Sequence, residues 1–128
     1  ENADARFIHQ HVVDAWAAQT ASTKTKPIRL VFALVGLYLH LECGRTGREV
    51  QLAHMQMARR KRDWPAIALP PERGPVTAID VMRAAPGAER DRAIDRWCES
   101  VWAAFSSEAG VIAALLAEYG IDGRRPAR

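Results

Sequence analysis

The sequence predicts a single all-α domain, a bundle of five or six helices. Alanine, leucine, arginine and glutamate, all favourable in helices, are frequent among the 128 residues. Apolar residues recur at spacings of three and four along most of the chain, which is the helical period. The segment from Leu30 to Leu39 is apolar on every side. Because such a segment must be surrounded by neighbours, we expect a central helix at about residues 27–43.

The first two helices are predicted from their apolar stripes and from the turn between them. Residues 3–19 carry apolar side chains at helical spacings, so one broad face of this helix can pack on a core. The polar segment 20–26 is predicted to be a loop. Pro27 suits the first turn of the next helix, where a missing amide hydrogen costs little. Gly44 suits the left-handed residue that ends that helix.

Two sequence patterns mark the starts of later helices. Thr46 and Glu49 form a capping box, in which each side chain bonds the backbone amide of the other residue. Thr77 with Asp80 predicts a second N-cap, which opens a short helix. Between them, the proline-rich segment 65–75 is predicted to be an extended strap across the bundle.

The C-terminal part of the chain predicts two further helical segments. Residues 88–105 form a long amphipathic pattern with three aromatic anchors, and Ser106-Ser107 is expected to break or bend it. A last apolar helical segment follows. We expect the domain to comprise residues 1–120 and the tail, residues 121–128, to be disordered.

Charge and cysteine content bound the class of protein. The net charge of +3 arises from 18 basic and 15 acidic residues, so acidic partners are favoured only mildly. Cys43 and Cys98 form no CxxC pair, and we expect both to be reduced and apolar in role. The longest apolar run is well short of the roughly 20 residues that span a bilayer. A cytoplasmic location without a membrane partner is therefore the prediction.

Small side chains on the central helix raise two alternatives. Arg29, Ala33, Gly36 and His40 share one face, and the small residues there leave room. A closely crossing neighbour helix could fill that room. Alternatively, it is a pocket between the first three helices, walled by histidines. The favoured function is accordingly a small-molecule-binding or enzyme-like bundle.

The candidate site residues are polar groups that the first three helices can bring together. The candidates for acid–base catalysis are His11, Asp14, His40 and His54. The candidates for ligand binding are Arg29, Trp16, Gly36 and Tyr38. An enzyme and a binding protein are both compatible with these residues. The structural alternative is that each histidine is half-buried and bonded to backbone or water.

A divalent metal ion is a second interpretation of the histidines. The candidate ligands are His9, His11, His40 and His54, which suit zinc, iron or manganese. The sequence contains neither an HExxH motif nor a paired ExxH motif. Metal-assisted chemistry is therefore ranked behind a site without metal.

Two basic segments suggest other ligands. Arg45 and Arg48 flank the start of the third helix, where free amides favour an anion, although the capping box already explains this sequence. Residues 59–62, RRKR, followed by Trp64, could contact nucleic-acid phosphate and stack a base. We prefer a solvated helix end with a packing anchor, because no recognised binding motif accompanies the cluster. The alternative function is a non-enzymatic module that binds nucleic acid or protein through this basic face.

Three segments resemble a known family. HQHVVDAWAAQ, TKPIRLVFALVGLYLHLE and GRTGREVQ are similar to segments of uncharacterised bacterial proteins, mainly actinobacterial, that are classed as a domain of unknown function. The resemblance extends from Ala3 to Phe105 and implies no established activity. The resemblance supports an intact domain fold more strongly than it supports any particular mechanism.

Overall fold

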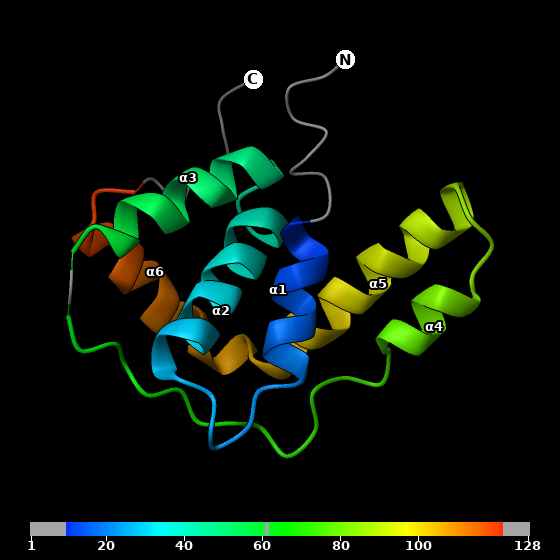
Figure 1. Ribbon diagram of the computed structural model, residues 1–128, viewed down its shortest axis with the longest axis horizontal. Coiled ribbons are helices and arrows are strands. Elements are labelled where there is room, and N and C mark those ends of the chain that lie inside the picture. The colour runs from blue at the N-terminus through cyan, green and yellow to red at the C-terminus, as the bar shows by residue number, and fades with distance from the viewer. Residues whose placement is uncertain (1–9, 61, 122–128) are drawn as a thin grey trace.

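A computed structural model describes residues 10–60 and 62–121, and it confirms the all-α prediction. The elements are α1 (Gln10–Gln19), α2 (Pro27–Leu41), α3 (Gly47–Ala58), α4 (Ala78–Arg83), α5 (Ala88–Ala104), the 3₁₀ turn η2 (Ser106–Glu108) and α6 (Ala109–Glu118). The described ranges contain no β strand. Figure 1 shows α1 and α2 side by side, with α5 and α6 on opposite sides of this pair and α3 above it.

The helix α2 lies at the centre of the bundle and contacts α1, α3, α5 and α6. Its buried residues are Leu30, Val31, Ala33, Leu34, Val35, Gly36, Leu37 and Leu39. Pro27 occupies its first turn, as the sequence predicts. The helix ends at Leu41, two residues earlier than expected, because the chain then turns through Gly44 with φ of 68°. There the Arg45 amide donates to the Leu39 carbonyl at 2.9 Å.

The predicted capping box at Thr46 and the predicted second N-cap at Thr77 are both confirmed. At the start of α3, the Thr46 amide donates to Oε1 of Glu49 at 2.9 Å, and the Glu49 amide donates to Oγ1 of Thr46 at 3.2 Å. At the start of α4, the Thr77 amide donates to Oδ2 of Asp80 at 2.8 Å. These bonds satisfy amides that no helical carbonyl can reach, so each helix begins where its cap lies.

The proline-rich segment between α3 and α4 is an extended strap, as predicted. Figure 1 shows it passing along one edge of the bundle, below α2 and α1. Ile67 and Leu69 are half-buried and pack against the core. Nε2 of Gln19, at the end of α1, donates to the Val76 carbonyl at 2.7 Å. Nη1 of Arg73 in turn donates to the Ala21 carbonyl. The strap is therefore bonded to the end of α1.

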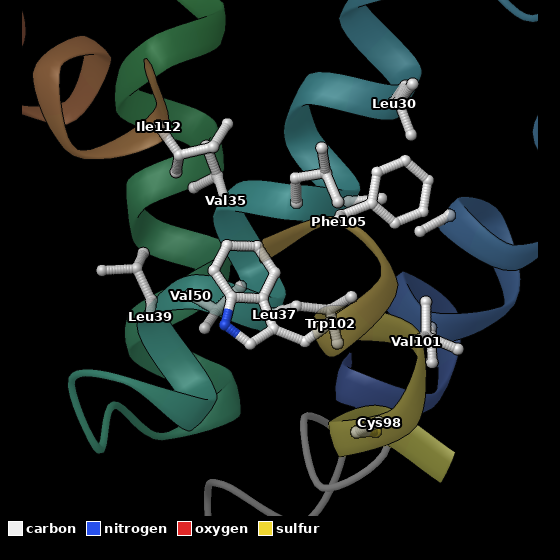
Figure 2. Close-up of a cluster of buried hydrophobic side chains, with 14 of the residues drawn as sticks. Leu30, Val35, Leu37, Leu39, Val50, Cys98, Val101, Trp102, Phe105 and Ile112 are labelled. Atoms are coloured by element: carbon white, nitrogen blue, oxygen red, sulfur yellow. The ribbon is translucent and has the colours of Figure 1, made fainter. Parts of the chain in front are cut away.

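The core is formed where α2, α5 and α6 meet. Figure 2 shows side chains from these helices gathered there, among them Val35, Leu37, Trp102, Phe105 and Ile112. All five side chains are buried. This cluster fixes the position of α2, which carries the candidate residues Arg29, Gly36, Tyr38 and His40.

The predicted break after α5 is confirmed, because η2 separates α5 from α6. The two helical segments are bent by 65° at this point. In the described part of the chain, no single helix has the length and apolar character needed to cross a membrane; α5 and residues 106–118 meet that criterion only as a bent pair.

The described residues end just beyond the expected domain boundary. Ile121 is half-buried against the core, and its amide donates to the Leu116 carbonyl at 3.0 Å. Residues 122–128, most of the tail predicted to be disordered, lie outside the described residues, as do residues 1–9 of the predicted first helix.

Candidate functional site

Asp14 on α1 is the one buried charged side chain among residues 10–60 and 62–121, with 4% of its surface exposed. Nε2 of Gln10, one turn earlier, donates to Oδ1 of Asp14 at 3.2 Å. Nε2 of Gln51 on α3 donates to Oε1 of Gln10 at 2.9 Å. The other carboxyl oxygen, Oδ2, is buried and has no hydrogen-bond partner within the described structure. A buried polar atom left without a partner is rare in proteins and calls for an explanation.

The small residue Gly36 provides the space for this carboxyl group. A Cβ atom at Gly36 would lie 1.8 Å from Oδ2 and 2.5 Å from Cγ of Asp14. The room that the sequence predicts on this face of α2 is therefore taken, at Gly36, by the Asp14 side chain of α1. Any larger residue at this position would have to displace the Asp14 side chain or push the two helices apart.

Burial changes the protonation of Asp14. It raises the pKa of the carboxyl group from 3.8 to about 8, and the hydrogen bond from Gln10 opposes only part of that rise. Asp14 is therefore mainly a neutral carboxylic acid at pH 7. Because Oδ1 accepts from Gln10, the proton belongs on Oδ2. This atom is then a hydrogen-bond donor that has no acceptor in the described structure.

Asp14 forms part of the wall of a cavity between α1, α2 and α3. The cavity has a volume of about 620 Å³, within the range of pockets that hold small organic molecules. Its lining is mostly apolar, with Val13, Ala17 and Ile28 among the contributors. The polar lining residues are Gln10, Asp14, Thr20, Thr25, Arg29 and His54. The cavity thus combines an apolar body with a few hydrogen-bonding groups.

His54 on α3 contributes a titratable ring to this cavity. Its Nε2 lies 2.8 Å from the Phe32 carbonyl oxygen, and its ring stacks on the Phe32 ring with centroids 5.0 Å apart. A carbonyl can only accept, so Nε2 carries the hydrogen and Nδ1 carries the lone pair in the neutral ring. Burial lowers the pKa of His54, although the bond to the carbonyl opposes this. A neutral acid and a neutral base therefore line the same cavity.

The structure divides the predicted histidines between two places. His11 of α1 and His40 of α2 stack on each other, with ring centroids 4.5 Å apart and planes inclined by 15°. Neither ring lines the cavity that holds His54. Asp95 of α5 lies beside the stacked pair. His9, the fourth predicted metal ligand, lies outside the described residues.

The predicted ligand-binding residues are also divided. Trp16, 55% exposed, and Arg29, also exposed, both line the cavity. Gly36 is buried beneath Asp14 and supports the cavity wall without lining it. Tyr38 is not among the lining residues; it packs edge-on against Trp102, with centroids 5.9 Å apart. Tyr38 therefore belongs to a different surface of α2.

The predicted anion site lies at a separate hollow of about 300 Å³ beside α3. Arg45 lines this hollow together with Glu49, and Nη1 of Arg45 lies 3.5 Å from Oε2 of Glu49. Arg48 is exposed and is not part of the lining. The acidic partner reduces the positive charge that Arg45 could offer an anion.

The aromatic residue of the predicted basic face is used within the fold. Trp64 stacks on Tyr119 with the planes inclined by 4°, and Phe32 contacts its edge. Nη1 of Arg62 lies 2.6 Å from Oε1 of Glu118. The Arg60 guanidinium lies 4.4 Å above the Tyr119 ring. These contacts correspond to a helix end with a packing anchor, the alternative that the sequence favours.

Comparison with protein families gives one match. A model of the family of unknown function DUF5946 matches residues 1–106. The chain belongs to this family. Comparisons with curated proteins and with solved structures give no match.

The DUF5946 match contains both groups of polar residues, whereas α6 follows it. Several residues that shape these two groups were missed by sequence reasoning, among them the polar Gln10, Gln51 and Asp95 and the aromatic Phe32. Gln10 precedes Asp14 by four residues, a spacing that could have identified it as a partner on the same helix face. Asp95 offers no such signal, because it reaches His11 and His40 only through the packing of α5.

Proposed function

We propose that this DUF5946 protein binds a small organic molecule in the cavity between α1, α2 and α3, and that Asp14 donates a hydrogen bond to it. One observation carries this proposal: Asp14 lines the cavity, and its buried Oδ2 has no hydrogen-bond partner among the described residues. A ligand acceptor atom would remove the cost of that unpaired group, which is about 1–3 kcal/mol for buried donors and acceptors in general.

The lining defines the class of ligand. Phe32, Ile28 and Val13 suit an apolar or aromatic body, and the protonated Asp14 suits a carbonyl oxygen or an imine nitrogen on it. Arg29 and Trp16 lie at exposed positions of the lining, where a polar substituent could extend towards solvent. We therefore infer an aromatic or aliphatic carbonyl compound rather than a sugar or a nucleotide.

The same groups could support acid–base chemistry. Asp14, with a pKa of about 8, can give a proton to a bound carbonyl oxygen near neutral pH. His54 is neutral in that pH range and can accept a proton through Nδ1. An enzyme of this kind would catalyse enolisation or a related proton transfer next to the carbonyl group. Binding alone requires only Asp14.

The test is a nuclear magnetic resonance titration with acetophenone and benzamide as probes and cumene, which has no carbonyl, as the control. We expect both carbonyl probes to shift the backbone amides of Ala17, Phe32 and Ala33. Their affinity should fall above pH 8, where Asp14 loses its proton and can no longer donate. Cumene should bind more weakly and without this pH dependence.

Two variants separate hydrogen bonding from shape. Asp14→Asn places a neutral amide donor in the same position, so it should bind the carbonyl probes equally well at pH 6 and pH 9. Trp16→Ala should weaken binding without altering its pH dependence, and Met82→Ala, at a residue that is 74% exposed on α4, should change nothing. The proposal is wrong if neither carbonyl probe shifts the cavity amides, or if Asp14→Asn retains the wild-type loss of affinity above pH 8.

A further inference from the structure

A second group of polar side chains lies outside the cavity, where α1, α2 and α5 meet. It consists of His11, His40 and Asp95, one from each helix. The nearest available ligand atoms, one ring nitrogen of each histidine and one carboxylate oxygen, all lie within 4.8 Å of one another. In the described part of the chain this is the one such group of three or more potential metal ligands. We call it the His–His–Asp cluster.

The helix packing explains why these residues converge. His11 precedes Asp14 by three residues, and His40 follows Gly36 by four, so the close contact of Asp14 with Gly36 brings the two rings together one turn further along. Sγ of Cys98 on α5 donates to the His11 backbone carbonyl at 3.6 Å. These contacts hold α1 against α2 and α5, the helices that carry His40 and Asp95.

We propose that the His–His–Asp cluster binds a divalent first-row transition-metal ion of the Zn²⁺ or Co²⁺ type. Two imidazoles and one carboxylate suit such ions better than Mg²⁺ or Ca²⁺, which prefer oxygen ligands alone. Three protein ligands leave at least one coordination position for water or another molecule. This inference does not depend on a ligand in the cavity, since none of the three residues lines it.

The ligand atoms lie near one another, but the rings are not oriented for coordination. Ligand atoms around tetrahedral zinc lie about 3.3 Å apart, so each side chain needs to move by less than about 1 Å. The two rings must also tilt, because their planes are inclined by only 15° and the lone pairs of parallel rings do not converge. His11 and His40 are half-buried and Asp95 is exposed, which gives the side chains this freedom and gives an ion access from solvent.

The experiment uses the tag-free full chain after dialysis against a chelator. Calorimetric titration with Zn²⁺ should show one ion per chain, and neither Mg²⁺ nor Ca²⁺ should bind comparably. Co²⁺ should give visible absorption bands typical of nitrogen and oxygen ligands, without a thiolate charge-transfer band. His40→Ala, His11→Ala and Asp95→Asn should each weaken Zn²⁺ binding at least about tenfold.

Matched controls distinguish these ligands from other residues of the same type. His54→Ala removes a histidine from the cavity, and Asp91→Asn removes an equal charge from the exposed surface of α5; both should retain wild-type affinity. Far-ultraviolet circular dichroism of the metal-free variants should be unchanged. The proposal is overturned if Zn²⁺ does not bind in a one-to-one ratio, or if His40→Ala binds it as well as His54→Ala does. Neither result would bear on binding of carbonyl probes in the cavity.

Discussion

Two polar sites lie about one helical turn apart on α1 and α2, and they differ in exposure. Asp14 lies against Gly36 with 4% of its surface exposed, whereas the His–His–Asp cluster has two half-buried rings and an exposed carboxylate. In the first site the acidic group becomes neutral because burial disfavours its charge. In the second site the Asp95 carboxyl group is exposed to water, where a cation could reach it. We thus propose the same residue type as a hydrogen-bond donor in one site and as a metal ligand in the other.

The comparison also shows what each site requires of the helix packing. The Asp14 site requires that α1 and α2 lie close together, since a Cβ atom at Gly36 would overlap the carboxyl group. The cluster tolerates small changes in packing, because its side chains can rotate towards an ion. We therefore expect stability to depend strongly on the first site and weakly on the second.

The largest effect is expected from Gly36→Ala. The added methyl group would lie 1.8 Å from Oδ2 of Asp14, and we expect the free energy of unfolding in urea to fall by about 3 kcal/mol or more. Gly110→Ala is the matched control, since a Cβ atom there meets nothing within 4 Å in α6. It should stabilise the protein by about 0.5–1 kcal/mol. Equal effects of the two substitutions would contradict the close contact.

The second largest effect that we expect is the pH dependence of stability that Asp14 confers. Its folded pKa of about 8 lies above its unfolded value near 3.8, so the folded state holds a proton that the unfolded state releases between these values. The contribution of Asp14 to the free energy of unfolding is fully present below about pH 4. It is lost as the pH rises towards 8, and the free energy of unfolding falls by at most about 1.4 kcal/mol per pH unit.

Comparison with Asp14→Asn isolates this contribution. The pKa of His54 is lowered by burial, so His54 affects stability only below about pH 6.5, and burial raises the pKa of Cys98 to about 12. Between pH 6.5 and pH 8, wild-type stability should therefore fall by about 2 kcal/mol relative to Asp14→Asn. Parallel curves for the two proteins would show that Asp14 is ionised in the fold.

The smallest effect is expected from removing one histidine of each site. His54→Ala removes a hydrogen bond to the Phe32 carbonyl and a stacked ring, and should cost about 1–2 kcal/mol. His40→Ala removes a ring from the His–His–Asp cluster and should cost about 0.5 kcal/mol. Both are measured by urea unfolding at pH 8 with a chelator present. If His40→Ala lowered the free energy of unfolding more than His54→Ala did, His40 rather than His54 would be the histidine that stabilises the fold.

Local patterns were sufficient for most helix boundaries. The capping boxes at Thr46 and Thr77, Pro27 at the start of α2 and Gly44 after it act within a few residues, so their neighbours in sequence are also their partners in space. The central position of α2 also followed from its apolar run, because a helix that is apolar on every side is stable only when surrounded.

The grouping of the site residues could not be obtained in this way. Asp14 and His54 were among the predicted polar residues, and both line the cavity. His40 was assigned to the same pocket but lies with His11, because the rotation of α2 about its axis directs Gly36 to Asp14 and places His40 one turn beyond. Spacing along one helix indicates which residues share a face, but it does not indicate which neighbour that face meets.

The sequence by itself therefore determined the helices, most of the ends that the structure describes, the central helix and the types of chemical group available. The tertiary structure decided which groups act together and in what protonation state. The raised pKa of Asp14 depends on burial by α2, and the position of Asp95 beside His11 and His40 depends on the docking of α5. Both are effects of contacts between residues distant in sequence, and such contacts leave no periodic signal in either segment.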